Sequence, residues 1–172
     1  IHFIDVALSA PLPQDTLVHY DLIHSTASGT EQGIADWSPH LLHQGQTRPN
    51  FVLASRADNL MFGSCRKPHH ASRDGLAQAD TVLSERITQA HARPALLMLS
   101  GDQVYADSLW TSVPTLKAWN ELDRVDKVKR KATRTMEEQL DRFYCDLYCK
   151  QWSRPEVARL LARVPSAMMW DD

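Results

Sequence analysis

From residue 59 onward, the apolar positions fall into three short continuous runs that alternate with stretches of helical periodicity. The runs occupy residues 59–65, 95–102 and 166–172, and they read NLMFGSC, ALLMLSGD and SAMMWDD. Continuous apolar runs of this length are typical of parallel strands that are buried on both faces and joined by crossover helices. We therefore expect an α/β fold in which the three runs form parallel strands of one sheet.

The residues between the first two runs predict the crossover helix. From about Gly75 to His91 the apolar side chains recur at helical spacing, and Asp74 is placed to cap the N-terminus of the helix. The residues expected on its buried face are Leu76, Ala79, Leu83, Ile87 and Ala90. Arg93 and Pro94 then end the helical stretch before the second apolar run.

Two further helices are predicted between the second and third runs, at residues 133–150 and 154–164. The apolar face of the first would carry Met136, Leu140, Phe143, Tyr144 and Leu147. The basic run at 127–134 is expected to be a solvated helix face or loop rather than an anion-binding patch. Cys145 and Cys149 lie four residues apart on one helix face. We expect them to pack in the core, because zinc-type partners are absent from the neighbouring sequence.

Residues 1–55 follow a different pattern, with short alternating or apolar stretches separated by turn-forming residues. The stretches HFIDVAL, TLVHYDLI and PNFVLAS predict antiparallel strands and hairpins. A sheet this small is stable only when it packs on something else. We therefore expect a small all-β domain at 1–57 and a separate α/β domain at 58–172.

Composition narrows the classes of partner. The chain has 172 residues and a net charge of −2, which gives no electrostatic reason to expect nucleic-acid recognition or membrane-surface binding. No apolar run approaches the ~20 residues that a membrane-spanning helix needs. Three cysteines at irregular spacing do not make a disulfide framework. The compartment stays open between the cytoplasm and a bacterial periplasmic or secreted location.

Each of the three expected strands ends on side chains that can bind a metal or an anion. Cys65 and Arg66 follow the first, Asp102 and Tyr105 the second, and Asp171-Asp172 the third. The carboxyl ends of parallel strands share one edge of the sheet, where functional crevices form. Crowded carboxylates repel one another unless a cation neutralises them, so a metal site is the economical explanation. Taken singly, Tyr105 and Cys65 would each more often be a packed apolar side chain.

The donor types narrow the choice of metal. Carboxylate and phenolate oxygens are hard donors, whereas a thiolate is soft. A phenolate suits trivalent iron better than zinc or magnesium. The combination therefore indicates iron in at least one position, with room for a second, oxygen-bound divalent ion.

Three segments together resemble a known family. FGSCRKPHH at 62–70, MLSGDQVYAD at 98–107 and MMWDD at 168–172 are similar, in order and spacing, to three motifs of the PhoD-like alkaline phosphatases and phosphodiesterases. That group belongs to the calcineurin-like metallophosphoesterases. The resemblance covers residues 59–172. It implies a metallophosphoesterase-type β-sandwich flanked by helices, of which this chain supplies the first half, preceded by a small immunoglobulin-like β domain.

The resemblance also implies roles for individual residues. Asp102 matches the Gly-Asp aspartate that bridges two metals in the superfamily. Tyr105 and Cys65 match iron ligands of the PhoD-like branch, and Asp172 stands where the superfamily has an asparagine ligand to the second metal. The implied cofactors are iron and a divalent ion such as calcium. The histidine that normally follows the third motif, and the later ligands, are not among these 172 residues.

The function we expect is hydrolysis of a phosphomonoester or phosphodiester by a metal-activated hydroxide. Arg66 is expected to bind the phosphoryl group, because a guanidinium matches phosphate with two parallel hydrogen bonds. His69 and His70 follow in the same loop and could reach the substrate, although exposed loop residues are the simpler interpretation.

Two alternatives were weighed against this hypothesis. A cysteine phosphatase with Cys65 as nucleophile needs an arginine six residues later, where this chain has Ala71. A catalytically inactive binding or scaffold protein with a degenerate metallophosphatase domain stays open. Stoichiometric iron in the intact protein would argue against it, because a scaffold has no need to hold iron.

The ends of the chain carry one further expectation. The sequence starts at Ile1, and its third apolar run ends directly at Asp172. Domains seldom end at the exit of a core strand, because termini are normally exposed. We therefore expect this chain to be the N-terminal portion of a longer catalytic domain, to need the remainder as its partner, and to be inactive alone.

Overall fold

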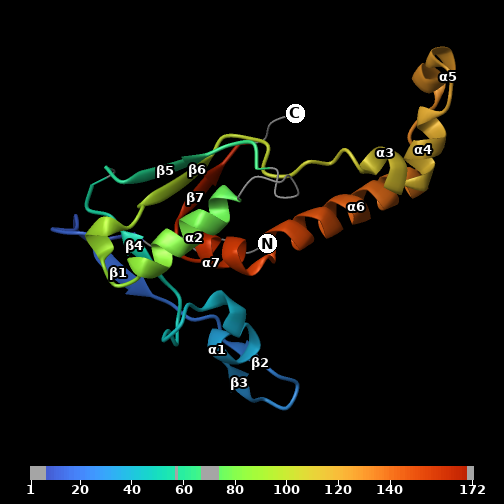
Figure 1. The fold of residues 1–172 in the computed structure, drawn as a ribbon. Coiled ribbons are helices and arrows are strands. Elements are labelled where there is room, and N and C mark those ends of the chain that lie inside the picture. Colours follow the sequence, from blue (N-terminus) through green and yellow to red (C-terminus); the bar gives the residue numbers. More distant parts are fainter. Residues whose placement is uncertain (1–6, 57, 67–73, 170–172) are drawn as a thin grey trace.

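The centre of the molecule is a three-stranded parallel sheet. The structure is a computed structural model that describes residues 7–56, 58–66 and 74–169. The strands β5 (Leu60–Gly63), β6 (Leu96–Leu99) and β7 (Ser166–Met168) lie side by side in the order β5-β6-β7 (Figure 1). Both pairs are parallel, with Met61 opposite Leu97 and Leu97 opposite Ser166. The predicted parallel arrangement of the three apolar runs is confirmed.

Two helices cover one face of this sheet. The helices α2 (Gly75–Glu85) and α7 (Pro155–Leu161) contact each other and enclose the core beneath the strands. The buried core residues are Leu83, Leu97, Leu99, Leu160 and Val164. The cap of α2 is as predicted, because the Asp74 carboxylate accepts a hydrogen bond from the Leu76 amide at 3.0 Å.

Helix α2 ends six residues earlier than predicted. The Arg86 amide bonds back to the Leu83 carbonyl in a tight final turn, and a short 3₁₀ helix, η2 (Ala90–Ala92), follows. The carbonyl of Ile87 accepts a hydrogen bond from the buried Arg93 guanidinium at 3.2 Å. Ile87 and Ala90 therefore do not belong to the helix, and their placement on its buried face is wrong.

The opposite face of the sheet is open within the described residues. Phe62 is 68% exposed and Leu60 is 51% exposed, and Met98 on the neighbouring strand is exposed as well. Phe62 and Met98 are register partners, so their side chains form one apolar surface. We expected strands buried on both faces, and this part of the chain buries only one, because α2 and α7 both pack on the same side.

The N-terminal segment contains antiparallel strands, as predicted. Strand β1 (Thr16–His19) pairs with β4 (Asn50–Leu53), and β2 (His24–Ser25) pairs with β3 (Glu31–Gln32). The sequence did not predict the short helices α1 (Ile34–Trp37) and η1 (Pro39–Leu41) between them. The boundary after residue 57 and an immunoglobulin-like arrangement stay predictions.

Buried polar side chains join the N-terminal segment to the α/β unit. Arg93, which is fully buried, donates from its guanidinium to the Asn50 side chain and carbonyl and to the Arg163 carbonyl. Burial lowers the pKa of Arg93 to about 10. Asp80 on α2 accepts hydrogen bonds from His43 at 2.8 Å and from Arg159 at 2.6 Å. The β segment is thus bound to the helices through specific polar contacts.

Residues 109–152 form a helical arm that extends away from the sheet (Figure 1). It comprises α3 (Leu109–Ser112), α4 (Pro114–Asn120), α5 (Arg124–Lys129) and α6 (Arg134–Trp152). The predicted helix at 133–150 is confirmed, and the basic run at 127–134 is mostly solvent-exposed, as expected. No described helix is long and apolar enough to cross a membrane.

The core packing predicted for Cys145 and Cys149 is wrong. Both thiols are exposed, and α6 has no buried residue. The helix contacts α4 and α7, and the described residues leave its central turns in solvent. The amphipathic pattern therefore predicted the helix correctly, but among the described residues no surface covers its apolar face.

Candidate functional site

The carboxyl ends of β5 and β6 stay paired beyond the strands themselves. The Ser100 amide donates to the Gly63 carbonyl at 3.0 Å, and the Cys65 amide donates to the Gly101 carbonyl at 3.2 Å. The Arg66 amide then donates to the Asp102 carbonyl at 2.9 Å. These bonds hold the two strand-end loops side by side, as expected for neighbouring parallel strands.

Both loops contain a non-glycine residue in the left-handed backbone region. Cys65 has φ 55° and Asp102 has φ 54°. Side chains larger than glycine seldom adopt this region, and such strain persists where surrounding bonds fix it, often at functional sites. Gly101, with φ 118°, supplies the turn before Asp102 that other residues would resist. The backbone therefore aims the Cys65 and Asp102 side chains at the cost of local strain.

Tyr105 joins these two residues. Its hydroxyl donates to the Asp102 carboxylate at 2.9 Å. This hydrogen bond, with burial and the neighbouring Cys65 thiol, raises the pKa of Tyr105 to about 12. Without a cation beside it, the phenol is therefore protonated near neutral pH. The structure thus brings together a thiol, a carboxylate and a phenol that the sequence had placed on two separate strands.

The cluster of Cys65, Asp102 and Tyr105 contains side chains that can bind a metal. Within the residues that the structure describes, no three His, Cys, Asp or Glu side chains are grouped as a metal site. The cluster supplies two such side chains, Cys65 and Asp102, together with the phenol of Tyr105. The thiol is a soft donor, whereas the carboxylate and phenol oxygens are hard donors. Asp172, the fourth expected ligand, lies outside the described residues.

Arg66 lies at this edge, but its guanidinium is already paired. Its Nη2 contacts the Asp74 carboxylate at 2.7 Å, its Nη1 contacts Gln151 at 3.4 Å, and its side chain is only 10% exposed. Burial acts to raise the pKa of Asp74, but the hydrogen bond and charge of Arg66 outweigh it and hold that pKa below its ordinary value. His69 and His70, which follow Arg66 in the sequence, lie outside the described residues.

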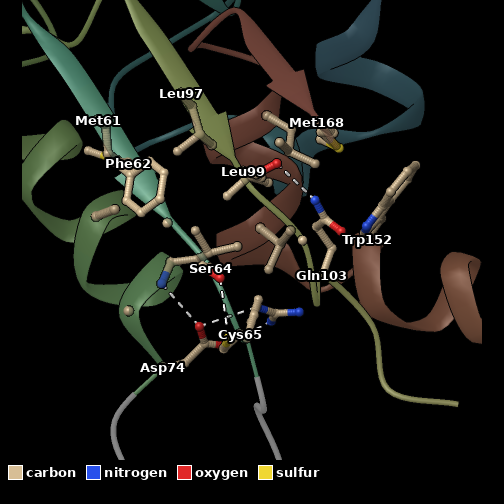
Figure 2. Close-up of a pocket in the computed structure, with 18 residues that line it drawn as sticks. Met61, Phe62, Ser64, Cys65, Asp74, Leu97, Leu99, Gln103, Trp152 and Met168 are labelled. Carbon is tan, nitrogen blue, oxygen red and sulfur yellow. Dashed lines mark hydrogen bonds and ion pairs between the residues drawn. The ribbon is translucent and has the colours of Figure 1, made fainter. Parts of the chain in front are cut away.

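Gln103 is a further residue at this edge that the sequence did not predict. Its amide nitrogen donates to the Leu99 carbonyl at 3.1 Å (Figure 2) and to the Met169 carbonyl at 2.9 Å. These bonds tie the exits of β6 and β7 together directly beside Asp102. A glutamine immediately after the Gly-Asp pair was the available signal, because a polar side chain there can satisfy the backbone at a strand end.

A partly open cleft of about 390 Å³ adjoins the two loops (Figure 2). It lies between the sheet and the helices α2, α6 and α7. Cys65, Arg66, Gly101 and Gln103 form part of its wall, and most of the remaining wall is aliphatic or aromatic. The candidate site therefore consists of a polar strand edge with an apolar space beside it.

Together, the fold and this edge define an α/β protein whose reactive side chains gather at the carboxyl ends of parallel strands. A family model described as PhoD related phosphatase matches residues 78–172. The match covers more than half of the chain, and the chain belongs to this family. It includes Asp102 and Tyr105, and it begins after Cys65 and Arg66. The resemblance to PhoD-like phosphatases is thereby confirmed.

One curated relative is the uncharacterised protein YGR266W of Saccharomyces cerevisiae. It is 31% identical over 110 residues, which cover 54% of this chain and 15% of the yeast protein. The chain thus spans about 15% of the length of that relative. No solved structure matches the chain.

Proposed function

We propose that this chain carries the first part of the site of a metal-dependent phosphoester hydrolase that acts on phosphomonoesters or phosphodiesters. The family points to phosphatase chemistry. The observation that carries the proposal is the cluster of Cys65, Asp102 and Tyr105, held by paired strand-end loops with strained backbone. A purely structural loop has no need for three metal-binding side chains in this arrangement.

The proposed cofactors are iron and a divalent ion such as calcium. Cys65, Asp102 and Tyr105 would hold the iron, and Asp102 with Asp172 would hold the second ion. When bound, such ions lower the pKa of water and offset the charge that develops on the phosphoryl oxygens. Asp102 would serve as a ligand shared by the two ions, and the paired strand-end loops hold the backbone that carries it.

The neighbouring residues position this cluster. Gln103 holds the exits of β6 and β7 together, so it fixes the loop that carries Asp102. Arg66 is proposed to stabilise the phosphoryl group from the adjacent loop. Its pairing with Asp74 sets its direction, and two of its nitrogens can be shared with a phosphate oxygen without breaking that pair.

The remaining parts of the proposal concern the rest of the catalytic domain. The open face of the β5-β6-β7 sheet would pack against a second sheet and so complete a sandwich flanked by helices. The histidine ligands and the group that protonates the leaving oxygen would come from that second half. Substrate binding would then occur where both halves meet, at the carboxyl edge of the described sheet.

The test uses the full-length protein with iron and calcium supplied. Asp102→Asn should lose most of the bound metal and reduce hydrolysis of p-nitrophenyl phosphate or its bis-ester by at least a hundredfold, while the thermal transition changes little. Asp107→Asn is the matched control, because Asp107 is an exposed aspartate of the same loop. It should retain both metal and activity.

Equal metal content and turnover in Asp102→Asn and the wild type would contradict the proposal. A wild-type protein that holds no metal and has no activity would instead favour a catalytically inactive scaffold. Elemental analysis and a colorimetric assay on the same protein preparations distinguish these outcomes.

A further inference from the structure

The cleft beside the candidate site has two chemically different ends. One end is formed by Cys65, Gly101 and Gln103 at the strand edge. Most of the other wall residues are apolar, and they include Met61, Leu76, Ala79, Leu97, Trp152 and Leu161. The cleft therefore joins the strand edge, at the residues on either side of Asp102, to a space that water solvates poorly.

Most polar groups in the wall are already paired with protein atoms, and the remaining N–H groups of Arg66 are the ones proposed for the phosphoryl group. The Arg66 guanidinium and the Asp74 carboxylate neutralise each other, and the Gln103 amide nitrogen bonds two backbone carbonyls. The Gly101 carbonyl accepts the Cys65 amide. A sugar or a peptide placed against the apolar walls would leave its own donors and acceptors unpaired, which costs free energy.

The volume suits an organic group of modest size. An apolar cavity of about 150 Å³ is enough to accept benzene. The present cleft measures about 390 Å³, within the range of small-molecule sites, and it is partly open, with Cys65 in its wall. An aromatic ring or an alkyl chain of several carbons could enter from the Cys65 side.

We propose that this cleft binds the apolar organic group of a phosphoester whose phosphoryl group lies at the edge formed by Asp102 and Tyr105. The inference rests on the proposed hydrolase function and specifies its substrate class, namely phosphoesters whose ester oxygen carries an aryl or alkyl group. Trp152, at the end of α6, and Ala79, on α2, both line the wall and would limit the size of the group accepted.

The experiment measures binding rather than turnover. The full-length protein, loaded with iron and calcium, is titrated calorimetrically with inorganic phosphate and with n-alkylphosphonates from methyl to hexyl. Affinity should rise about three- to fourfold with each methylene until the cleft is filled, because each methylene leaves water for an apolar wall. Inorganic phosphate sets the baseline for the phosphoryl position alone.

Two variants test whether the cleft is responsible. Ala79→Leu fills part of the space, so it should remove the dependence on chain length beyond the first carbons while phosphate affinity stays unchanged. Ala77→Leu makes the same change on the same helix outside the cleft wall and should retain the dependence. Trp152→Ala removes one wall side chain of the cleft and should lower the affinity for the longer phosphonates. Because Trp152 is partly exposed, the substitution should not unfold the protein.

The outcomes separate this inference from the proposed function. Equal affinity for phosphate and for every alkylphosphonate would overturn the apolar site and leave the hydrolase proposal standing. A dependence on chain length that Ala79→Leu and Trp152→Ala both leave intact would place the apolar contact elsewhere and also overturn it. Failure of phosphate and of all phosphonates to bind the metal-loaded protein would contradict the proposed function itself.

Discussion

At the residue scale, Cys65, Asp102 and Tyr105 lie at one edge of the sheet, where hydrogen bonds between two strand-end loops hold them. Cys65, Asp102 and Tyr105 were recognisable because each follows an apolar run, and parallel strands bring such positions to one edge. The left-handed backbone at Cys65 and Asp102 could not be predicted, because it depends on hydrogen bonds between two loops far apart in the chain. The pairing of Arg66 with Asp74 is likewise a tertiary contact.

The Tyr105 phenol provides a spectroscopic prediction. A phenolate bound to ferric iron absorbs visible light, so the iron-loaded protein should be coloured. Tyr105→Phe should lose that band with little change in thermal stability, since the ring and its packing stay. In the metal-free protein, Tyr105 should ionise near its raised pKa of about 12, compared with an ordinary value of 10.0.

The measurement is an absorbance titration of wild type against Tyr105→Phe, with and without iron. The hydrogen bond to Asp102 is fully present below pH 10 and is lost as the pH rises through about 12. A colourless iron-loaded protein would show that Tyr105 is not an iron ligand.

His43 provides a second prediction at this scale. Burial lowers its pKa, Arg163 and Arg159 add to this effect, and the Asp80 carboxylate opposes it. Its Nδ1 atom is buried without a hydrogen-bond partner in the described structure, so protonation there is unfavourable. The unfolded chain binds this proton more readily, and stability should therefore fall as the pH drops below about 6.5, the ordinary value for histidine.

Urea unfolding between pH 7.5 and 5 would measure this effect, which cannot exceed about 1.4 kcal/mol per pH unit for one proton. His43→Gln should flatten the slope, whereas His24→Gln, at an exposed position, should leave it unchanged. An identical slope in His43→Gln would contradict the assignment.

At the element scale, local patterns predicted which elements form better than where they end. The three strands and the helices at 75 and 134 followed from apolar spacing and caps. The early end of α2 could not be predicted in this way. It accompanies a tertiary hydrogen bond, in which the buried Arg93 guanidinium donates to the Ile87 carbonyl. The exposure of Cys145 and Cys149 also escaped prediction, since a pattern cannot reveal whether a partner surface is present.

Asp74 has two roles, and they lead to an element-scale prediction. It caps α2 through the Leu76 amide, and it pairs with the buried Arg66. Asp74→Ala should destabilise the protein by roughly 3 kcal/mol or more, because a lost cap costs about 1 kcal/mol and a buried charge left unpaired costs further. Asp123→Ala removes a comparable cap from the exposed helix α5.

The comparison is made by urea unfolding monitored by circular dichroism. Asp123→Ala should cost about 1 kcal/mol or less, because only the cap is lost. Equal losses in the two variants would show that the Arg66–Asp74 pair contributes nothing beyond capping.

At the scale of the whole molecule, the open sheet face dominates the behaviour of residues 1–172. Phe62, Leu60 and Met98 expose a continuous apolar surface on strands that the sequence predicted to be buried on both faces. Surfaces of this kind drive association in water. The α/β class was predictable from the sequence, whereas the one-sided covering required the structure.

Residues 1–172 expressed alone should therefore self-associate and bind a hydrophobic dye. Phe62→Ser should reduce both effects several-fold, because it interrupts the centre of the apolar face. Val128→Ser is the control, since Val128 is 83% exposed on α5 in the helical arm and not on the sheet, and it should change little. Light scattering and dye fluorescence on the three proteins provide the test, and a monomeric wild type without dye binding would contradict it.

The buried Arg93 guanidinium also constrains how the chain can fold during synthesis. It bonds groups of residues 50, 87 and 163, so its contacts are complete only after all three have left the ribosome. At typical translation rates, the interval between residues 50 and 163 is roughly ten seconds. During that time strands β1 and β4 lack their complete contacts with the C-terminal part of the chain. Chaperone binding in this interval should therefore concentrate on the N-terminal strands.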